Sequence, residues 1–383
     1  MNQRIARWWR QLRRRVNIRR YRADLLAPET VARARPMNLY YEPTAYCNLK
    51  CKICYRETAD GFADNKHMPD AVFERVAAAY PDALSVLLLG YGEPLILPQL
   101  SEHIARCREH ELMGMTSTNG ILVDDKIIDL FLSGGLSLVN FSLDATTPET
   151  YKKVRGSDAF PKILDNFKRL SAEKRRRGLG APILCVSFCL LSDNLGDYPA
   201  LPRLAHELGA EHILTQPFEA DADFGGHKGL TVDAAELDRM VEAARVESLA
   251  LGISFWRTPH NQPPDLHPLD VAASPDGWRE PPLSGPPRFY CESLWRMMGV
   301  KYDGRVFPCC PRLNTIVGDL ATQTVDEVWN GPAYRRLRWE LLSGNYPKIC
   351  EKCPERRPFA PEEYFAQQMA WVDDVIALTA RTL

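Results

Sequence analysis

The chain has 383 residues, with 48 Lys and Arg against 49 Asp and Glu, and 45% of its residues are hydrophobic. This length suits a barrel-sized domain plus a smaller one, and the apolar content excludes a disordered chain. No stretch approaches the roughly 20 uncharged apolar residues of a membrane-spanning helix, and a net charge of −1 excludes whole-chain attraction to nucleic acid. The 11 cysteines favour metal ligation over disulfides, because the N-terminus lacks an apolar secretion signal. We expect a cytoplasmic metalloprotein.

Residues 1–36 form a basic segment with eleven arginines and no lysine. Helical spacing places a set of apolar residues on one stripe beside the arginines: Ile5, Trp8, Trp9, Leu12 and Val16. One interpretation is a solvated helix that packs Trp8 and Trp9 onto its own protein. A second is a helix whose residues 1–22 contact a membrane surface or an anionic ligand. A third is a targeting peptide.

From residue 37 to residue 256, short apolar strands alternate with amphipathic helices. Strands are predicted over 37–41, 84–89, 113–117, 138–143, 183–190, 212–215 and 252–256, and the helices include 70–79, 100–109, 161–177, 198–208 and 232–251. This alternation predicts a parallel α/β sheet with right-handed crossovers, either doubly wound or closed into a full or partial barrel. In such folds the functional residues gather at the C-terminal ends of the strands.

The remainder of the chain divides into three segments. Nine prolines interrupt residues 258–287, so 257–287 is predicted as a linker or a substrate-covering loop. A cysteine-bearing segment follows over 288–356. Residues 357–383 are predicted to contain one amphipathic helix, over 361–383.

Three cysteines follow directly after the first predicted strand: Cys47, Cys51 and Cys54, spaced C-x3-C-x2-C. A structural zinc site or an ordinary iron–sulfur cluster uses four protein ligands. No fourth cysteine or histidine lies close in sequence, the nearest being His67. Three cysteines would leave one iron open to an exogenous ligand, which is the arrangement expected of a reactive site.

The three cysteines and their position resemble the radical S-adenosylmethionine (radical SAM) superfamily, whose [4Fe-4S] cluster binds SAM at its unique iron. The resemblance implies a partial (β/α)6 TIM-like barrel over residues 37–256. One departure is Ile53, where the family usually has an aromatic residue. Tyr55 follows the third cysteine instead and would pack against the adenine.

Further segments match the same family in chain order. Each lies at the end of a predicted strand, except that Arg155 follows on the helix after the fourth strand. Alone, each is typical of an ordinary loop, cap or surface position. Together they imply that Gly92 and Glu93 contact the amino group of SAM and that Asn119 contacts its ribose. They also imply that Ser142 and Arg155 hold the SAM carboxylate and that Gln216 lies near the adenine.

The second group of cysteines is formed by Cys291, Cys309 or Cys310, Cys350 and Cys353, with an Asp-Gly hairpin signal at 303–304. It resembles the SPASM/twitch extension of radical SAM enzymes, a small α+β domain. Four available ligands imply one auxiliary [4Fe-4S] cluster. A zinc ribbon could use the same four thiolates. Cys310 either replaces Cys309 as a ligand or points away as a buried thiol.

The other cysteines permit simpler interpretations. Cys107 on a predicted helix is interpreted as a small buried hydrophobe. Cys185, Ser187 and Cys189 share one face of the fifth strand. The two thiols are either core residues or hydrogen donors to a substrate radical, as in radical SAM epimerases.

The resemblance implies that an external one-electron donor such as flavodoxin or ferredoxin reduces the first cluster, which cleaves SAM to a 5′-deoxyadenosyl radical. That radical removes hydrogen from a substrate, with oxidation or epimerisation as the outcome. We expect a small-molecule substrate, sugar-like or another biosynthetic intermediate, because only 36 residues precede the barrel where peptide-modifying relatives carry a recognition domain. The alternatives are a maturase of a ribosomally made peptide and a non-enzymatic zinc protein that binds nucleic acid.

Overall fold

The computed structural model describes residues 3–54, 56, 65–217, 232–257, 279–309, 315–346, 350, 353 and 356–382. One sheet of ten strands dominates these residues, in the order β11-β10-β9-β1-β2-β3-β4-β5-β6-β7. The strands of the N-terminal part pair in parallel with one another: β1 (Asn38–Tyr41), β2 (Ser85–Leu88), β3 (Met113–Thr118), β4 (Leu138–Ser142), β5 (Ile183–Leu190), β6 (His212–Pro217) and β7 (Ser254–Arg257). The predicted strands are therefore confirmed, in the predicted order.

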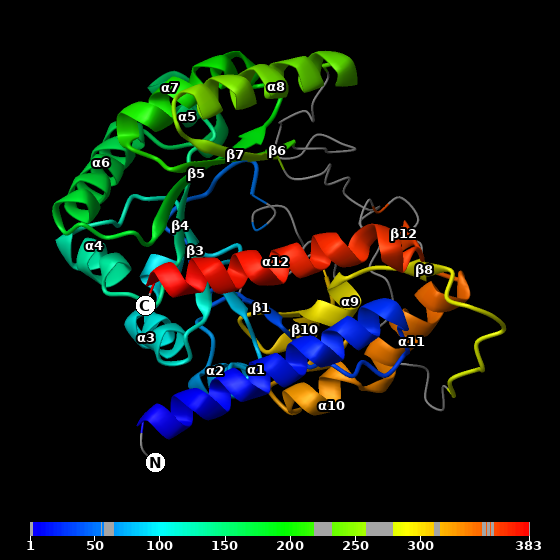
Figure 1. Cartoon of the computed structure of the whole chain (residues 1–383). Coiled ribbons are helices and arrows are strands. Elements are labelled where there is room, and N and C mark those ends of the chain that lie inside the picture. The colour runs from blue at the N-terminus through cyan, green and yellow to red at the C-terminus, as the bar shows by residue number, and fades with distance from the viewer. Residues whose placement is uncertain are drawn as a thin grey trace.

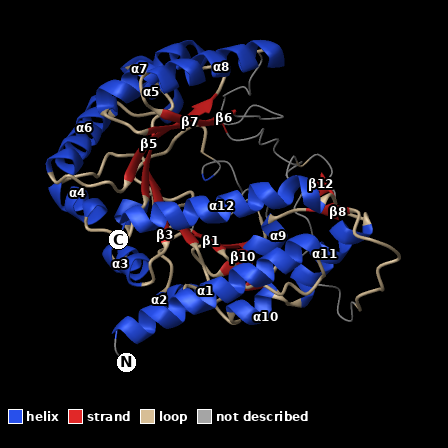
Figure 2. Cartoon of the chain, viewed as in Figure 1, coloured by secondary structure: helices blue, strands red, loops and turns tan. Residues whose placement is uncertain are grey.

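Helices connect the parallel strands and cover the outer side of the curved sheet, as Figures 1 and 2 show. They are α2 (Asp70–Ala77), α3 (Leu100–Glu109), α4 (Asp125–Leu132), α5 (Pro148–Arg155), α6 (Phe160–Arg176), α7 (Leu201–Leu208) and α8 (Ala234–Ala250), with short 3-10 turns η2 (Pro94–Ile96) and η3 (Leu195–Ala200). The predicted start of the 198–208 helix is wrong. Pro199 lies within η3 and lacks a backbone N–H, so the tighter turn precedes α7.

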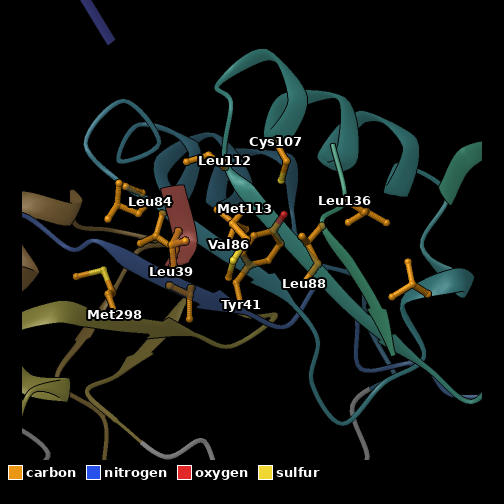
Figure 3. Close-up of a cluster of buried hydrophobic side chains, with 14 of the residues drawn as sticks. Leu39, Tyr41, Leu84, Val86, Leu88, Cys107, Leu112, Met113, Leu136 and Met298 are labelled. Atoms are coloured by element: carbon orange, nitrogen blue, oxygen red, sulfur yellow. The ribbon is translucent and has the colours of Figure 1, made fainter. Parts of the chain in front are cut away.

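The core between the first strands and α3 is shown in Figure 3. Leu39, Val86 and Leu88 are almost fully buried there, and Cys107 of α3 points into the same cluster. Cys107 is thus a buried apolar group, as the sequence predicts. Met298 contributes to this core from the C-terminal part of the chain.

The C-terminal region extends the barrel sheet. Its elements are β8 (Phe289–Tyr290), α9 (Ser293–Arg296), β9 (Met297–Val300), β10 (Arg305–Phe307), β11 (Gly318–Asp319), α10 (Val325–Trp329), α11 (Pro332–Ser343), β12 (Arg357–Pro358) and α12 (Pro361–Thr382). β9 pairs parallel with β1, and β10 turns back on β9 through the predicted hairpin. Gly304 has φ +100°, a left-handed conformation that favours glycine. The two predicted domains therefore share a continuous sheet.

The N-terminal helix α1 (Gln3–Leu26) packs beside α12 and α9. Its buried residues are Asn17, Tyr21, Asp24 and Leu25. Trp8 and Trp9 are 56% and 50% exposed, so the interpretation that they pack onto their own protein is wrong. Within the described residues, no helix combines the length and apolarity that crossing a bilayer requires.

Candidate active site

The loop that follows β1, residues 42–54, carries the first three cysteines and is called the cluster loop below. The backbone N–H of Cys54 donates to the carbonyl of Cys51 over 3.0 Å, which turns the loop back on itself. Burial raises the pKa of the Cys47 thiol, and it raises the pKa of the Cys54 thiol to about 11. In both cases the neighbouring thiols raise the pKa further, so the three sulfur atoms interact with one another.

This donor set fits an iron–sulfur cluster. Thiols with raised pKa values stay protonated in the free protein, and binding iron would deprotonate them. Among the described residues, no three side chains of His, Cys, Asp or Glu converge as closely as a single metal ion requires. The sulfur atoms are nevertheless near enough to influence one another electrostatically.

The glycine-rich loop after β2, residues 90–93, packs directly on the cluster loop. A Cβ atom at Gly92 would lie 2.1 Å from the carbonyl oxygen of Thr44 and 2.8 Å from that of Tyr46. The backbone N–H of Glu93 donates to the Tyr46 carbonyl over 2.7 Å. Only glycine fits at position 92, because the two backbones touch there.

Glu93 is a buried junction between strand ends. Its carboxylate accepts hydrogen bonds from the Thr118 hydroxyl at 2.7 Å and the Asn119 N–H at 2.8 Å. Burial raises the pKa of Glu93, and these hydrogen bonds oppose that rise. The side-chain amide of Asn119 donates to Asn48 in the cluster loop over 2.8 Å. Glu93 and Asn119 therefore connect the ends of β2 and β3 to the loop that carries Cys47.

Arg155, the last residue of α5, reaches the cluster loop from the other side. Its Nη1 donates to the sulfur of Cys51 over 3.5 Å, and its Nη2 forms an ion pair with Asp144. Its buried Nε has no hydrogen-bond partner among the described protein atoms. The geometry places Arg155 beside Cys51, while its predicted contact with the SAM carboxylate stays a prediction.

Asp144 is a site residue whose role sequence reasoning missed. It follows β4 with φ +57°, a left-handed conformation that aspartate tolerates better than most residues. Its carboxylate also accepts the backbone N–H of Cys189 over 2.7 Å. Asp144 thus ties Arg155 to the end of β5. The sequence signal that could have identified Asp144 was an acidic residue directly after a predicted strand.

A row of uncharged polar side chains crosses the inner face of the sheet below the strand ends. The hydroxyls of Ser117 and Ser142 are 3.2 Å apart, and Asn140 Nδ2 donates to Ser117 over 2.8 Å and to Ser187 over 2.9 Å. We call Ser117, Asn140, Ser142 and Ser187 the polar ladder. Asn140 is 8% exposed, and its Oδ1 has no partner among the described protein atoms.

Cys185 and Cys189 are both buried on β5 but differ in their surroundings. Cys189 forms a buried cluster with Val154 and Leu191, against which Ile53 of the cluster loop and Tyr91 of the glycine-rich loop pack. Gln216 lies beside Cys189 in register. Cys185 lies four residues earlier on the strand, next to Asn140, and burial raises the pKa of its thiol. The structure thus brings Cys189 and Gln216, but not Cys185, to the strand ends around the cluster loop.

Strand pairing brings together three cysteines of the second group, Cys291, Cys350 and Cys353. β12 pairs antiparallel with β8, with Arg357 opposite Tyr290, which places Cys350 and Cys353 near Cys291. Burial raises the pKa of Cys291 well above its usual range, and the thiols of Cys350 and Cys353 raise it further. Cys309 follows the hairpin and interacts with Tyr334 of α11. Cys310 and Tyr55 lie outside the described residues.

Glu42, at the start of the cluster loop, links the two regions of the chain. It is buried, and burial raises its pKa to about 7 against the opposing charge of Lys301. A Cβ at Gly90 would lie 2.5 Å from its Cγ. The sequence did not predict this role of Glu42, because its partner Lys301 is remote along the chain.

Comparison with known proteins identifies both regions. Residues 41–190 match the radical SAM superfamily, and residues 291–354 match the SPASM iron–sulfur cluster-binding domain. The AdoMet-dependent heme synthase of Methanosarcina barkeri is 24% identical over 348 residues, which cover 87% of this chain and 95% of that protein. The PqqA peptide cyclase of Gluconobacter oxydans is 24% identical over 84% of this chain and 83% of its own length. The match to the probable GTP 3′,8-cyclase of Methanocaldococcus jannaschii, at 26% identity, spans about half of that relative (54%) and 44% of this chain.

Solved structures confirm the fold. SuiB from Streptococcus suis, bound to its precursor peptide SuiA, superposes with a TM-score of 0.62 at 18% identity, covering 84% of this chain and 70% of SuiB. The structure of anSMEcpe with bound AdoMet gives a TM-score of 0.52 at 16% identity, covering 83% and 86% of the two chains. The chain therefore belongs to the radical SAM superfamily, as an enzyme that uses SAM and [4Fe-4S] clusters and carries a C-terminal SPASM domain.

Proposed function

We propose that this chain modifies a peptide, by removing a hydrogen atom from it at the end of the barrel where the cluster loop lies. The observation that carries the proposal is the match to a peptide cyclase across both the barrel and the SPASM domain. The fold neighbour SuiB was solved with a precursor peptide. These relatives favour a peptide over the sugar-like substrate that the sequence suggested.

The polar ladder supports the same substrate class. Its four side chains are hydroxyls and one amide, without a fixed charge, and the buried Oδ1 of Asn140 needs a hydrogen-bond donor. A peptide backbone supplies such N–H donors. A phosphorylated nucleotide would instead require arginine or lysine. Of the described arginines beside the cluster loop, Arg155 pairs with Asp144, and Arg56 donates to the Ala45 carbonyl and to Asn65.

In this proposal the chain's own residues position the reacting groups. When bound, the first cluster and SAM supply the radical chemistry. Cys47, Cys51 and Cys54 hold that cluster, and Gly92, Glu93 and Arg155 fix the loop that carries them. Contacts of Tyr55, Asn119, Ser142 and Gln216 with SAM are part of the proposal. Cys291, Cys309 or Cys310, Cys350 and Cys353 would hold one auxiliary cluster, and an external flavodoxin or ferredoxin would supply the electron.

The fate of the substrate radical depends on whether a thiol returns a hydrogen atom. Cys189 is the better-placed candidate of the two thiols on β5, because it belongs to the buried cluster against which Ile53 of the cluster loop packs. Turnover in D2O distinguishes the outcomes. An epimerase would incorporate deuterium into the product, and the variant Cys189→Ala would lose this incorporation. An enzyme that oxidises its substrate would release a product that has lost two hydrogen atoms and contains no added deuterium.

The experiment that tests the peptide proposal uses reconstituted holoenzyme, SAM, reductant and candidate peptides encoded near this gene, under anaerobic conditions. We expect 5′-deoxyadenosine formation above the peptide-free background and a mass change in the peptide. Asn140→Ala should raise KM for the peptide, while the control Asn345→Ala, on the loop after α11, should not. Modification of no peptide, together with turnover of a porphyrin-type substrate, would favour the second candidate, a small-molecule enzyme. The heme synthase match over 95% of that relative supports this candidate.

A further inference from the structure

Helix α1 is attached to the protein by one face only. Asn17 donates to the carbonyls of Arg35 at 3.1 Å and Asp82 at 3.0 Å, Tyr21 donates to Gln368 over 3.2 Å, and Asp24 accepts the N–H of Ala34 over 2.9 Å. These residues follow the spacing of one helix face. Because this face is anchored in the core, α1 is already folded in the free protein. Figure 1 shows it running along the outside of the molecule.

The opposite face of α1 is apolar and exposed. Of the 13 exposed large hydrophobic side chains among the described residues, five lie on this helix: Ile5, Trp8, Trp9, Val16 and Leu26. At 3.6 residues per turn they form one stripe with Leu12, turned away from the anchored face. We call Ile5, Trp8, Trp9, Leu12 and Val16 the outer stripe. An amphipathic helix of a globular protein normally turns its apolar stripe toward the core, so this helix has the reverse orientation.

Arginines border the outer stripe. Arg7, Arg13 and Arg14 face the protein, where they bind Glu111, Asp82 and backbone carbonyls. Arg15, Arg19 and Arg20 are exposed and lie on the same side as the stripe. The first acidic residue of the chain is Asp24, which is buried. The exposed face of α1 therefore combines apolar groups with positive charge alone.

We propose that α1 binds an anionic lipid bilayer, with the outer stripe among the lipid headgroups and upper acyl chains. Tryptophan prefers this interface, and arginines beside it pair with lipid phosphates while their stems remain in the apolar zone. A second copy of the chain is disfavoured, because a symmetric contact would bring Arg15, Arg19 and Arg20 of both copies together. A single convex helix also matches a flat lipid surface, where no groove is required. This inference is independent of the substrate proposed above.

Flotation of the full-length holoenzyme with lipid vesicles tests the proposal. We expect binding to vesicles that mix phosphatidylcholine with phosphatidylglycerol, weak binding to pure phosphatidylcholine, and loss of binding at high salt. Replacing Arg15, Arg19 and Arg20 with glutamine should weaken binding roughly 100-fold, since each basic residue near an anionic surface contributes about a factor of five. The variant Trp8→Ser/Trp9→Ser should also lose binding.

Matched controls separate this surface from general effects. Trp256→Ser removes a tryptophan on β7 that is 56% exposed, equal to Trp8, and Arg176→Gln removes an exposed arginine of α6. Both controls should bind vesicles like the wild type, and all variants should cleave SAM at the wild-type rate. The proposal is overturned by equal binding of wild type and α1 variants. It is also overturned if the outer stripe instead mediates dimerisation, protein capture or DNA binding in the absence of vesicle binding.

Discussion

Gly92→Ala is the substitution for which the structure makes the most specific prediction. The new methyl group would lie 2.1 Å from the Thr44 carbonyl oxygen, whereas ordinary contacts begin at 3.4 Å, so the two loops must separate by 3.4 − 2.1 = 1.3 Å. Both contacting groups are backbone, and no side chain can rotate away to make room. The separation also breaks the hydrogen bond between Glu93 N–H and the Tyr46 carbonyl.

The cost follows from these two effects. Overpacking a close contact costs about 1–3 kcal/mol, and a lost hydrogen bond costs about 1 kcal/mol more. We expect Gly92→Ala to lower the free energy of unfolding by about 2–4 kcal/mol. The displacement also moves Cys47 relative to Cys51 and Cys54, so iron affinity at the first site should fall about 10–100-fold, as for other disturbed supports of metal ligands.

Anaerobic reconstitution followed by iron counting and a SAM-cleavage assay measures this effect. The matched control is Gly196→Ala, because Gly196 has no heavy atom within 4 Å of the added methyl group and an ordinary backbone conformation. Gly92→Ala should lose iron at the first site and with it deoxyadenosine formation, while Gly196→Ala keeps both. Wild-type iron content and activity in Gly92→Ala would refute the argument that Gly92 sets the position of the cluster loop.

Three further variants test other parts of the fold and site. Burial lowers the pKa of His103 to about 4, so the unfolded chain binds more protons than the folded chain between pH 6.5 and 4, and stability falls as the pH drops through that window. In urea unfolding, the loss of stability should be about 3 kcal/mol smaller in His103→Gln than in the wild type. The control is His206→Gln, which changes an exposed histidine. Arg338→Leu removes hydrogen bonds to Leu294, Thr30 and Asn330 and should cost about 3 kcal/mol of unfolding free energy by denaturant titration, and an unchanged midpoint would contradict this. Cys350→Ser/Cys353→Ser should remove about four iron atoms per chain, whereas Cys107→Ser, which changes a buried cysteine of α3, should remove none. Equal iron content in the two variants would show that the second group of cysteines holds no cluster.

The sequence predicted the elements well because their signals are local. Strands of apolar residues, the cysteine spacing and the Asp-Gly hairpin each depend on neighbouring residues, and the structure confirms them. The parallel pairing of β9 with β1 was not predictable in this way, since Met297 and Asn38 are remote along the chain and short strands carry no partner signal. As a result the two predicted domains appeared separable, whereas Glu42 and Lys301 lie together in the fold.

The site shows the same division. The motif residues lie near the strand ends, and their contacts with SAM stay predictions. The contacts they make with one another depend on side-chain geometry that no spacing encodes. Glu93 bonds to Thr118 and Asn119, and Arg155 pairs with Asp144 and reaches Cys51. The sequence also did not predict whether the apolar stripe of α1 faces the protein or the solvent. Helical periodicity shows which residues share a face of the helix, but not which face packs against the rest of the protein.

The most direct test of the central conclusion is iron counting and SAM cleavage by the reconstituted wild type, compared with the triple variant Cys47→Ala/Cys51→Ala/Cys54→Ala. With four iron atoms in each cluster, the wild type should hold about eight and form 5′-deoxyadenosine under reductant. The triple variant should keep about four iron atoms and form none. Bound zinc with no SAM cleavage by the wild type, or deoxyadenosine formation by the triple variant, would contradict the assignment of Cys47, Cys51 and Cys54 to the catalytic cluster.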